Sequence, residues 1–249
     1  MTGVKKRVLV LGGTAEARAL AGMLIDHDGI EVISSLAGRT QGGAPLPGKT
    51  RLGGFGGAAG LRAYLRDQSI AAVVDATHPF AERISENAKD ACDGAAVPRL
   101  YLARPAWRTP DGADTETVAT IEDAAKITGE PSRRVFLTIG NRGLEAFLDH
   151  TESFFLVRTI EKPHINPPAN WTLIQDRPPY SIEHERDLMV RHAIDTLVTK
   201  SSGGSATAAK IGAATDLGVK IVQVARPASP PGEAVETPEQ AARWVLEKI

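Results

Sequence analysis

The sequence predicts an α/β protein built from two domains whose sheets are mainly parallel. Short apolar runs alternate with helical patterns along the whole chain, as in repeated strand–helix units. The runs are continuously hydrophobic, which is typical of strands buried on both faces. The 249 residues suit two domains of roughly 100–140 residues each, and 42% hydrophobic residues are enough to fill two cores.

The first element carries the clearest functional pattern. Val8 to Leu11 is an apolar run expected to form a strand, and residues 15–24 are rich in helix-forming residues. Strand, glycine turn and helix open a nucleotide-binding βαβ unit, in which glycine lets the backbone approach a pyrophosphate and the first amide groups of the helix hold the anion. We therefore expect a Rossmann-like domain, with an ordinary turn as the alternative. The expected cofactor-binding residues here are Gly12, Gly13, Thr14, Ala15 and Glu16.

The match to G-x-G-x-x-G is incomplete, because Thr14 and Ala17 stand where the second and third glycines belong. The second strand, Glu31 to Leu36, ends near Gly38, Arg39 and Thr40. An acidic residue at this place would accept from the 2′-hydroxyl of NAD, whereas a guanidinium and a hydroxyl suit a 2′-phosphate. The pattern favours NADPH, with a solvated loop arginine as the alternative. Gly38, Arg39, Thr40 and Gly53 complete the expected cofactor-binding set.

One motif points to a different function. Residues 43–50 match the P-loop pattern G-x-x-x-x-G-K-T, which must leave a strand and run directly into a helix. Pro45 and Pro47 remove two amide donors, and four glycines between positions 53 and 57 exclude a helix that begins at Thr50. We expect a loop that does not hydrolyse nucleotides.

Polar residues follow the strand predicted at Ile70 to Val74. The sequence there is Asp75-Ala76-Thr77-His78-Pro79-Phe80-Ala81, and side chains at the carboxyl end of such a strand face the ligand crevice. We expect Asp75, Thr77 and His78 to be catalytic. The six histidines show no paired metal-ligand spacing, so no metal is expected. A helix from Glu82 to Cys92 and a strand from Val97 to Leu102 follow.

The composition of residues 104–112 is that of a linker, so we expect an N-terminal NADPH-binding domain over 1–106 and a C-terminal domain over 107–249. Facing loops of the two domains would form a substrate cleft. Strands are expected near 116–119, 135–139, 154–159, 171–175, 194–199 and 219–224. Helices are expected after Thr120, over 142–148, from Ser181 to His192, from about 200–204 to Leu217, and after the capping box at Thr237.

A second candidate site lies at Thr199-Lys200-Ser201-Ser202-Gly203-Gly204. A lysine, two hydroxyls and two glycines at the start of a helix would form an anion site. The expected substrate-binding residues are Arg104, Lys200, Ser201, Ser202 and Gly203.

Composition excludes several classes. A net charge of −1 argues against a nucleic-acid partner, and a single cysteine, Cys92, excludes a disulfide framework or a cysteine-based zinc site. No apolar run is long enough to span a membrane, and the polar start is unlike a signal peptide, so we expect a cytoplasmic protein without a membrane partner. The oligomeric state is left open, and a monomer would suit the sequence.

Taken together, these segments resemble the precorrin-6A reductases of cobalamin (vitamin B12) biosynthesis. The matching pieces are Leu9–Arg18, Gly38–Thr40, Asp75–Ala81, Arg104-x-x-Trp107, Thr199–Gly204 and Arg226-Pro227. Two departures are Ser201, where an acidic residue is expected, and Pro178-Pro179-Tyr180-Ser181, where Gly-Pro-Phe-Ser is usual. Both lie in the second half.

The resemblance implies NADPH-dependent reduction of one double bond of the precorrin-6A macrocycle to give precorrin-6B, with a hydride passing to a ring carbon and a proton to its neighbour. A flat substrate with many carboxylates needs several cations, and Arg104, Arg108, Arg142, Lys200 and Arg226 stand at loop positions. The alternatives are a non-catalytic NADPH-binding sensor, a cobalt-precorrin-6A reductase and, more remotely, a nucleotide-sugar or P-loop enzyme.

Overall fold

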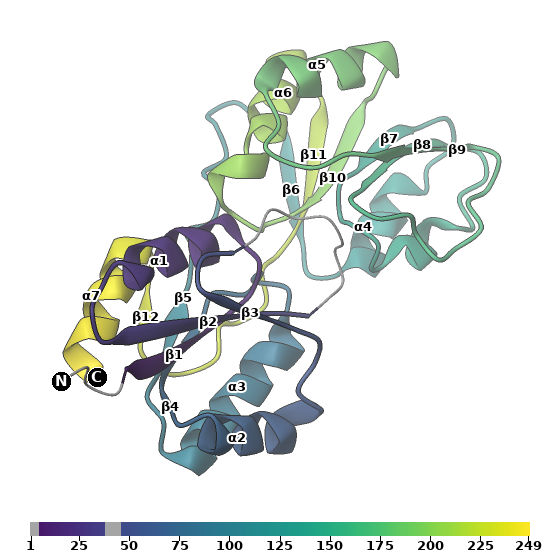
Figure 1. The fold of residues 1–249 in the computed structure, drawn as a ribbon. Coiled ribbons are helices and arrows are strands. Elements are labelled where there is room, and N and C mark those ends of the chain that lie inside the picture. The colour runs from purple at the N-terminus through teal and green to yellow at the C-terminus, as the bar shows by residue number, and fades with distance from the viewer. Residues whose placement is uncertain (1–4, 38–45) are drawn as a thin grey trace. The chain divides into compact units, whose positions relative to one another are not determined.

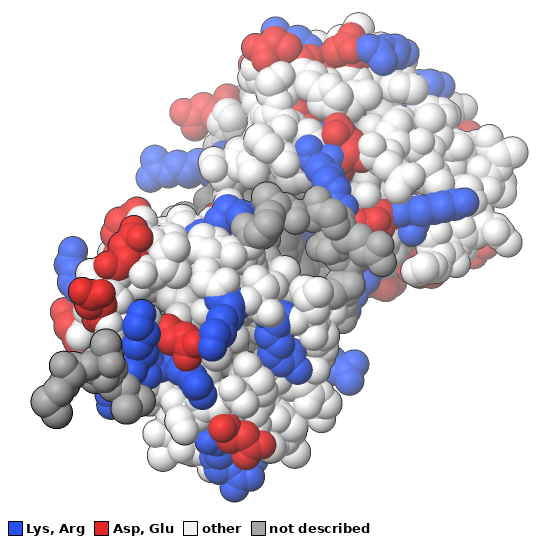
Figure 2. All heavy atoms as spheres, in the orientation of Figure 1, with Lys and Arg blue, Asp and Glu red and all other residues white. Residues whose placement is uncertain are grey.

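A computed structural model describes residues 5–37 and 46–249 of the chain, which form two α/β units (Figure 1). Unit 1 contains the chain up to Pro105 together with Pro227–Ile249, and unit 2 contains Ala106–Arg226. Figure 2 shows Lys and Arg interspersed with Asp and Glu on the visible face of each unit, as expected from a net charge near zero. Among the described residues, no helix has the length and hydrophobicity needed to cross a bilayer.

Unit 1 is a six-stranded parallel sheet in the order β12-β5-β4-β1-β2-β3. Its strands are β1 (Lys6–Leu11), β2 (Ile30–Leu36), β3 (Lys49–Leu52), β4 (Ile70–Asp75), β5 (Arg99–Leu102) and β12 (Ala234–Val235). Its helices are α1 (Ala15–Ile25), α2 (Gly57–Asp67), α3 (Glu82–Ala95) and α7 (Pro238–Lys248). Strand order reverses between β1 and β4, and open α/β sheets bind their ligands at such a switch point.

Alternating side chains of β1 explain why both faces of this sheet are covered. Val8 and Val10 pack into the core that α1 and α7 share, while Leu9 and Leu11 pack into the core beneath α2 and α3. Figure 1 shows α1 and α7 on one face of the sheet and α2 and α3 on the other. Successive strand residues point to opposite faces, so a continuous apolar run requires helices on both sides.

Unit 2 is also a six-stranded parallel sheet, in the order β6-β11-β10-β7-β8-β9. Its strands are β6 (Thr115–Val118), β7 (Arg134–Leu137), β8 (Phe154–Thr159), β9 (Trp171–Gln175), β10 (Thr196–Lys200) and β11 (Lys220–Val224). Its helices are α4 (Ile121–Thr128), α5 (Ile182–Arg191), α6 (Ala209–Leu217) and the 3₁₀ turns η1 (Leu144–Phe147) and η2 (Ser205–Thr207). The switch point here lies between β7 and β10.

The predicted fold class, α/β with parallel sheets, is confirmed, but the chain is divided differently from the sequence prediction. Residues 227–249, expected in the second domain, belong to unit 1. Ala234 and Val235 pair in parallel with β5, and α7 buries Ala241 and Val245 against α1. A strand of two residues carries no pattern that would assign it to one sheet rather than the other.

Two local predictions also need correction, and one strand was not predicted. The helix expected over 142–148 is the 3₁₀ turn η1, and the helix expected directly after 200–204 begins only at Ala209, behind η2. Strand β3 was not predicted; Lys49 and Thr50, the last residues of the P-loop pattern, lie in it rather than at the start of a helix. The predicted caps at Thr120, Ser181 and Thr237 are confirmed.

A buried group of charges lies in unit 2. Arg158 Nη2 donates to Glu185 Oε1 over 2.8 Å, and these side chains are only 4% and 0% exposed. The Arg158 guanidinium lies 3.7 Å from the centroid of the Tyr180 ring. Burial, together with Arg158, lowers the pKa of Lys210 in α6 from 10.5 to about 7, although Glu185 acts in the opposite direction.

This pKa shift predicts a stability that depends on pH. Between about pH 7 and pH 10.5 the unfolded chain keeps a proton on Lys210 that the folded chain releases, so the free energy of unfolding should rise with pH through this window. Lys210→Met should flatten that rise when urea unfolding is measured at pH 7 and pH 9. Lys126→Met, which removes an exposed lysine of α4, is the control and should keep the wild-type slope. Equal slopes in Lys210→Met and wild type would contradict the prediction.

Candidate functional site

The turn after β1 lies directly against the turn after β4, at the switch point of unit 1. Gly12 has a φ of +116°, and a Cβ on it would stand 2.6 Å from the carbonyl oxygen of Ala76 and 2.9 Å from Thr77 Cα. Only glycine fits, because both the backbone conformation and the space exclude a side chain. The predicted glycine turn therefore brings the predicted catalytic segment next to the start of α1.

Thr14 explains one departure from the glycine pattern. Its hydroxyl accepts from the amide of Ala17 over 3.1 Å and donates to the carbonyl of Ala76 over 2.8 Å. Thr14 is thus the N-cap of α1 and a second link to the turn after β4. The amides of Ala15 and Glu16 lie in the first turn of α1, where no intrahelical acceptor exists.

Arg104 was predicted to bind substrate, but the structure places it beside the predicted cofactor residues. Its Nη1 donates to Glu16 Oε2 over 3.1 Å, and these side chains are 14% and 17% exposed. The ion pair offsets a negative charge at the start of α1 that would otherwise repel a phosphate.

Asp75 and Thr77 form an ordered polar chain. Asp75 is fully buried, and its Oδ1 accepts from both the amide of Thr77, over 3.1 Å, and the Thr77 hydroxyl, over 2.7 Å. The Thr77 Oγ1 lies 3.1 Å from Ser85 Oγ, and because its own proton is committed to Asp75, Ser85 is the donor. Asp75 therefore orients the loop after β4 from its buried position at the end of that strand.

His78 is held in one orientation. Its Nδ1 accepts from the amide of Phe80 over 3.2 Å, and the two rings lie 5.8 Å apart. A neutral imidazole that accepts at Nδ1 carries its proton on Nε2. His78 is half-buried, and Nε2 is the ring nitrogen that carries the proton in this tautomer.

A cavity of about 410 Å³ opens beside this loop, between α3 and residues 228–231. Pro79, Ser85 and Tyr101 line it, together with acidic residues of α3. The carboxylates of Glu82, Glu86 and Asp90 outnumber the one ammonium in the lining, that of Lys89, and would repel a pyrophosphate. The start of α1 is the better place for one.

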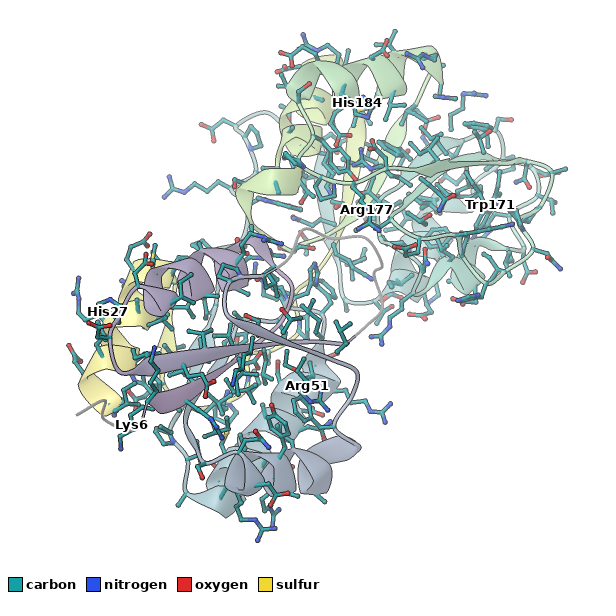
Figure 3. All side chains as sticks on the ribbon, viewed as in Figure 1. Lys6, His27, Arg51, Trp171, Arg177 and His184 are labelled. Atoms are coloured by element: carbon teal, nitrogen blue, oxygen red, sulfur yellow. The ribbon has the colours of Figure 1, made fainter. Side chains whose placement is uncertain are left out.

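The ends of β2 and β3 hold an arginine that the sequence analysis missed. The Nη1 and Nη2 atoms of Arg51 donate to the carbonyls of Gly53 and Gly54 over 2.6 and 2.8 Å (Figure 3). Its guanidinium lies 3.7 Å from the centroid of the Phe55 ring. Its Nη1 also donates to Ser35 Oγ over 3.5 Å. An arginine at the end of a strand, followed by two glycines and an aromatic residue, was the available signal. Gly38, Arg39 and Thr40 lie outside the described residues.

Gly53 also lies at this edge. Its amide donates to the carbonyl of Leu36 over 2.8 Å, and its φ is +105°. The predicted residue therefore continues the pairing of β3 with β2 past the end of both strands.

In unit 2, Lys200 ends β10 at the switch point. Its Nζ donates to the carbonyl of Ile139, which follows β7, over 2.8 Å. Burial, together with Arg142, lowers the pKa of Lys200 from 10.5 to about 8, so the side chain is mainly cationic at neutral pH. The predicted residues Ser201, Ser202 and Gly203 follow in one loop, whereas Arg104 belongs to unit 1.

Within the described part of the chain, no three His, Cys, Asp or Glu side chains are grouped as a metal site would require.

Comparison with known proteins identifies the family of the chain. A family model described as precorrin-6x reductase CbiJ/CobK matches residues 7–246. Proteins named precorrin-6A reductase are 44% identical in Rhodococcus erythropolis and 45% identical in Mycobacterium tuberculosis (strain ATCC 25618 / H37Rv), each alignment covering 96% of this chain and 97% of the relative. A solved structure named CobK precorrin-6A reductase, 35% identical, superposes with a TM-score of 0.91 over 98% of this chain and 97% of its own.

A reductase family with this Rossmann-like fold implies a nicotinamide cofactor, which agrees with the turn at Gly12. The chain belongs to the precorrin-6x reductase (CbiJ/CobK) family and is an oxidoreductase.

Proposed function

We propose that this chain uses NADPH to reduce one ring double bond of precorrin-6A, giving precorrin-6B in cobalamin biosynthesis. The observation that carries the proposal is full-length similarity to proteins named precorrin-6A reductase, at 44% and 45% identity. Relatives named cobalt-precorrin-6A reductase are 28–30% identical, so the cobalt-free substrate is favoured. A sensor without catalytic activity is not favoured by these relatives.

The first turn of unit 1 fits a dinucleotide. Gly12 lets the turn after β1 lie against the turn after β4, Thr14 caps α1, and Arg104 offsets the charge of Glu16. These features favour a pyrophosphate against residues 12–16. The nicotinamide, when bound, supplies the hydride.

Thr77 and His78 are the proposed groups beside the nicotinamide. Thr77 is fixed by Asp75, and His78 Nε2 carries the proton that a neutral imidazole can donate. We assign to His78 the orientation of the nicotinamide or the transfer of a proton to the substrate. Asp75 acts through Thr77 and is a positioning residue.

The loop of unit 2 supports the substrate assignment. Precorrin-6A carries several carboxylates, and Lys200 is a cation at the carboxyl edge of the sheet. Ser201, Ser202 and Gly203 follow it in a loop of small residues that lets a carboxylate approach the backbone.

The choice of cofactor is tested at Arg39. Arg39→Ala should weaken NADPH binding by about ten- to a hundredfold, the value of a charge-assisted contact to a phosphate, and leave NADH binding nearly unchanged. Titration of both cofactors measures this directly. Arg66→Ala, at an exposed position of α2, is the control and should change neither affinity. Equal losses for both cofactors would refute the assignment.

Substrate binding is tested at Lys200. Lys200→Ala should raise KM for precorrin-6A by about ten- to a hundredfold, with NADPH affinity unchanged, because a carboxylate partner is lost. Steady-state NADPH oxidation with varied precorrin-6A gives this value, and Lys126→Ala serves as an exposed control in the same unit. An unchanged KM would remove Lys200 from the substrate site.

A further inference from the structure

We propose that Trp107 and Arg226 are positioning residues that hold the loop Lys200–Gly204 in the form that receives a substrate carboxylate. The proposal rests on the substrate-binding function proposed above for this loop. Neither side chain needs to touch the substrate.

Two side chains bind three carbonyl groups within four residues of the loop. Arg226 donates from Nε to the carbonyl of Ser201 and from Nη2 to that of Ser202, both over 3.1 Å. Trp107 donates from Nε1 to the carbonyl of Gly204 over 2.7 Å. The Lys200 carbonyl is also bound within the loop, since the amide of Ser202 donates to it over 2.6 Å.

The direction of these carbonyls fixes the direction of the following amides. A trans peptide places its C=O and N–H on opposite sides. Because Arg226 binds the Ser202 carbonyl, the N–H of Gly203 points away from Arg226. Because Trp107 binds the Gly204 carbonyl, the N–H of Ser205 points away from Trp107. Neither amide has an acceptor among the described residues.

Glycine makes this arrangement possible. Gly203 and Gly204 have φ values of +69° and +83°, in the left-handed region that other residues rarely adopt. Backbone amides in turns built on such residues can form concave anion sites. The clamp therefore directs these amides away from Arg226 and Trp107, in the loop that directly follows the cationic Lys200.

The two clamping residues are themselves well supported. Trp107 packs against the core of unit 2, and Lys210 Nζ lies 4.9 Å from the centroid of its ring. Trp107 follows Ala106, the first residue of unit 2, and Arg226 is the last. Both ends of the unit's chain are thus fastened to one loop. This role also revises the sequence prediction for Arg226, two of whose nitrogens serve the loop backbone.

The test removes the donor of Trp107, replaces the two-donor fork of Arg226 and keeps the side-chain bulk. Trp107→Phe keeps an aromatic ring and loses the N–H, and Arg226→Lys keeps the charge and loses the planar fork. Each should raise KM for precorrin-6A by about tenfold, as expected for loss of one or two hydrogen bonds. NADPH affinity and kcat should stay within about twofold of wild type, since ground-state substrate binding is affected.

Trp244→Phe is the matched control. Trp244 Nε1 also donates over 2.7 Å, to Glu233 Oε2, but it lies in unit 1. The same substitution there should leave KM for precorrin-6A unchanged. A similar rise in KM in Trp244→Phe would overturn the proposal, because it would show a general effect of losing an indole donor.

The two proposals fail in different ways. If Lys200→Ala raises KM and both Trp107→Phe and Arg226→Lys leave it unchanged, the clamp is wrong and the substrate loop stands. If Lys200→Ala leaves KM unchanged, the loop is not the substrate site and the clamp falls with it. If Trp107→Phe does not fold, Arg226→Lys alone decides the outcome.

Discussion

The close approach of Gly12 to the backbone of Ala76 and Thr77 is the constraint on which the rest of unit 1 depends. A side chain at position 12 would collide with the carbonyl of Ala76, so this glycine sets how near the turns after β1 and β4 can come. Thr14 then ties the start of α1 to the same carbonyl. The result is a helix start, with its unpaired amides, beside the loop that carries Thr77 and His78.

Unit 2 repeats the strand arrangement around a different kind of site. Its switch point between β7 and β10 is bridged by a side chain, since Lys200 Nζ donates to the carbonyl of Ile139. The loop that follows is held by donors to its carbonyls from Trp107 and Arg226. In unit 1 a missing side chain permits close approach, whereas in unit 2 long side chains fix the loop. The first suits a pyrophosphate and the second suits substrate carboxylates.

Much of this fold could be predicted from the sequence because buried parallel strands have continuous apolar sequences, as in β1, β4 and β8. Helix caps such as Thr120 and Ser181 could be predicted because each depends on a hydrogen bond to an amide only three residues further along the chain. Strands β3 and β12 were missed because β3 is largely exposed and β12 is two residues long. The partner of Arg104 could not be predicted, because Glu16 lies 88 positions away in the sequence. The hydrogen bonds of Arg51 could not be predicted either, because they depend on the direction of the Gly53 and Gly54 carbonyls. The assignment of Asp75, Thr77 and His78 to catalysis stays a prediction, although the structure brings them together.

We infer that the switch point between β1 and β4 holds the dinucleotide. A crystal structure of the protein with NADP⁺ tests it most directly. We expect the pyrophosphate to lie against residues 12–16 and the nicotinamide ring to contact Thr77 and His78. A dinucleotide bound elsewhere, such as in the acidic cavity between α3 and residues 228–231, would contradict it.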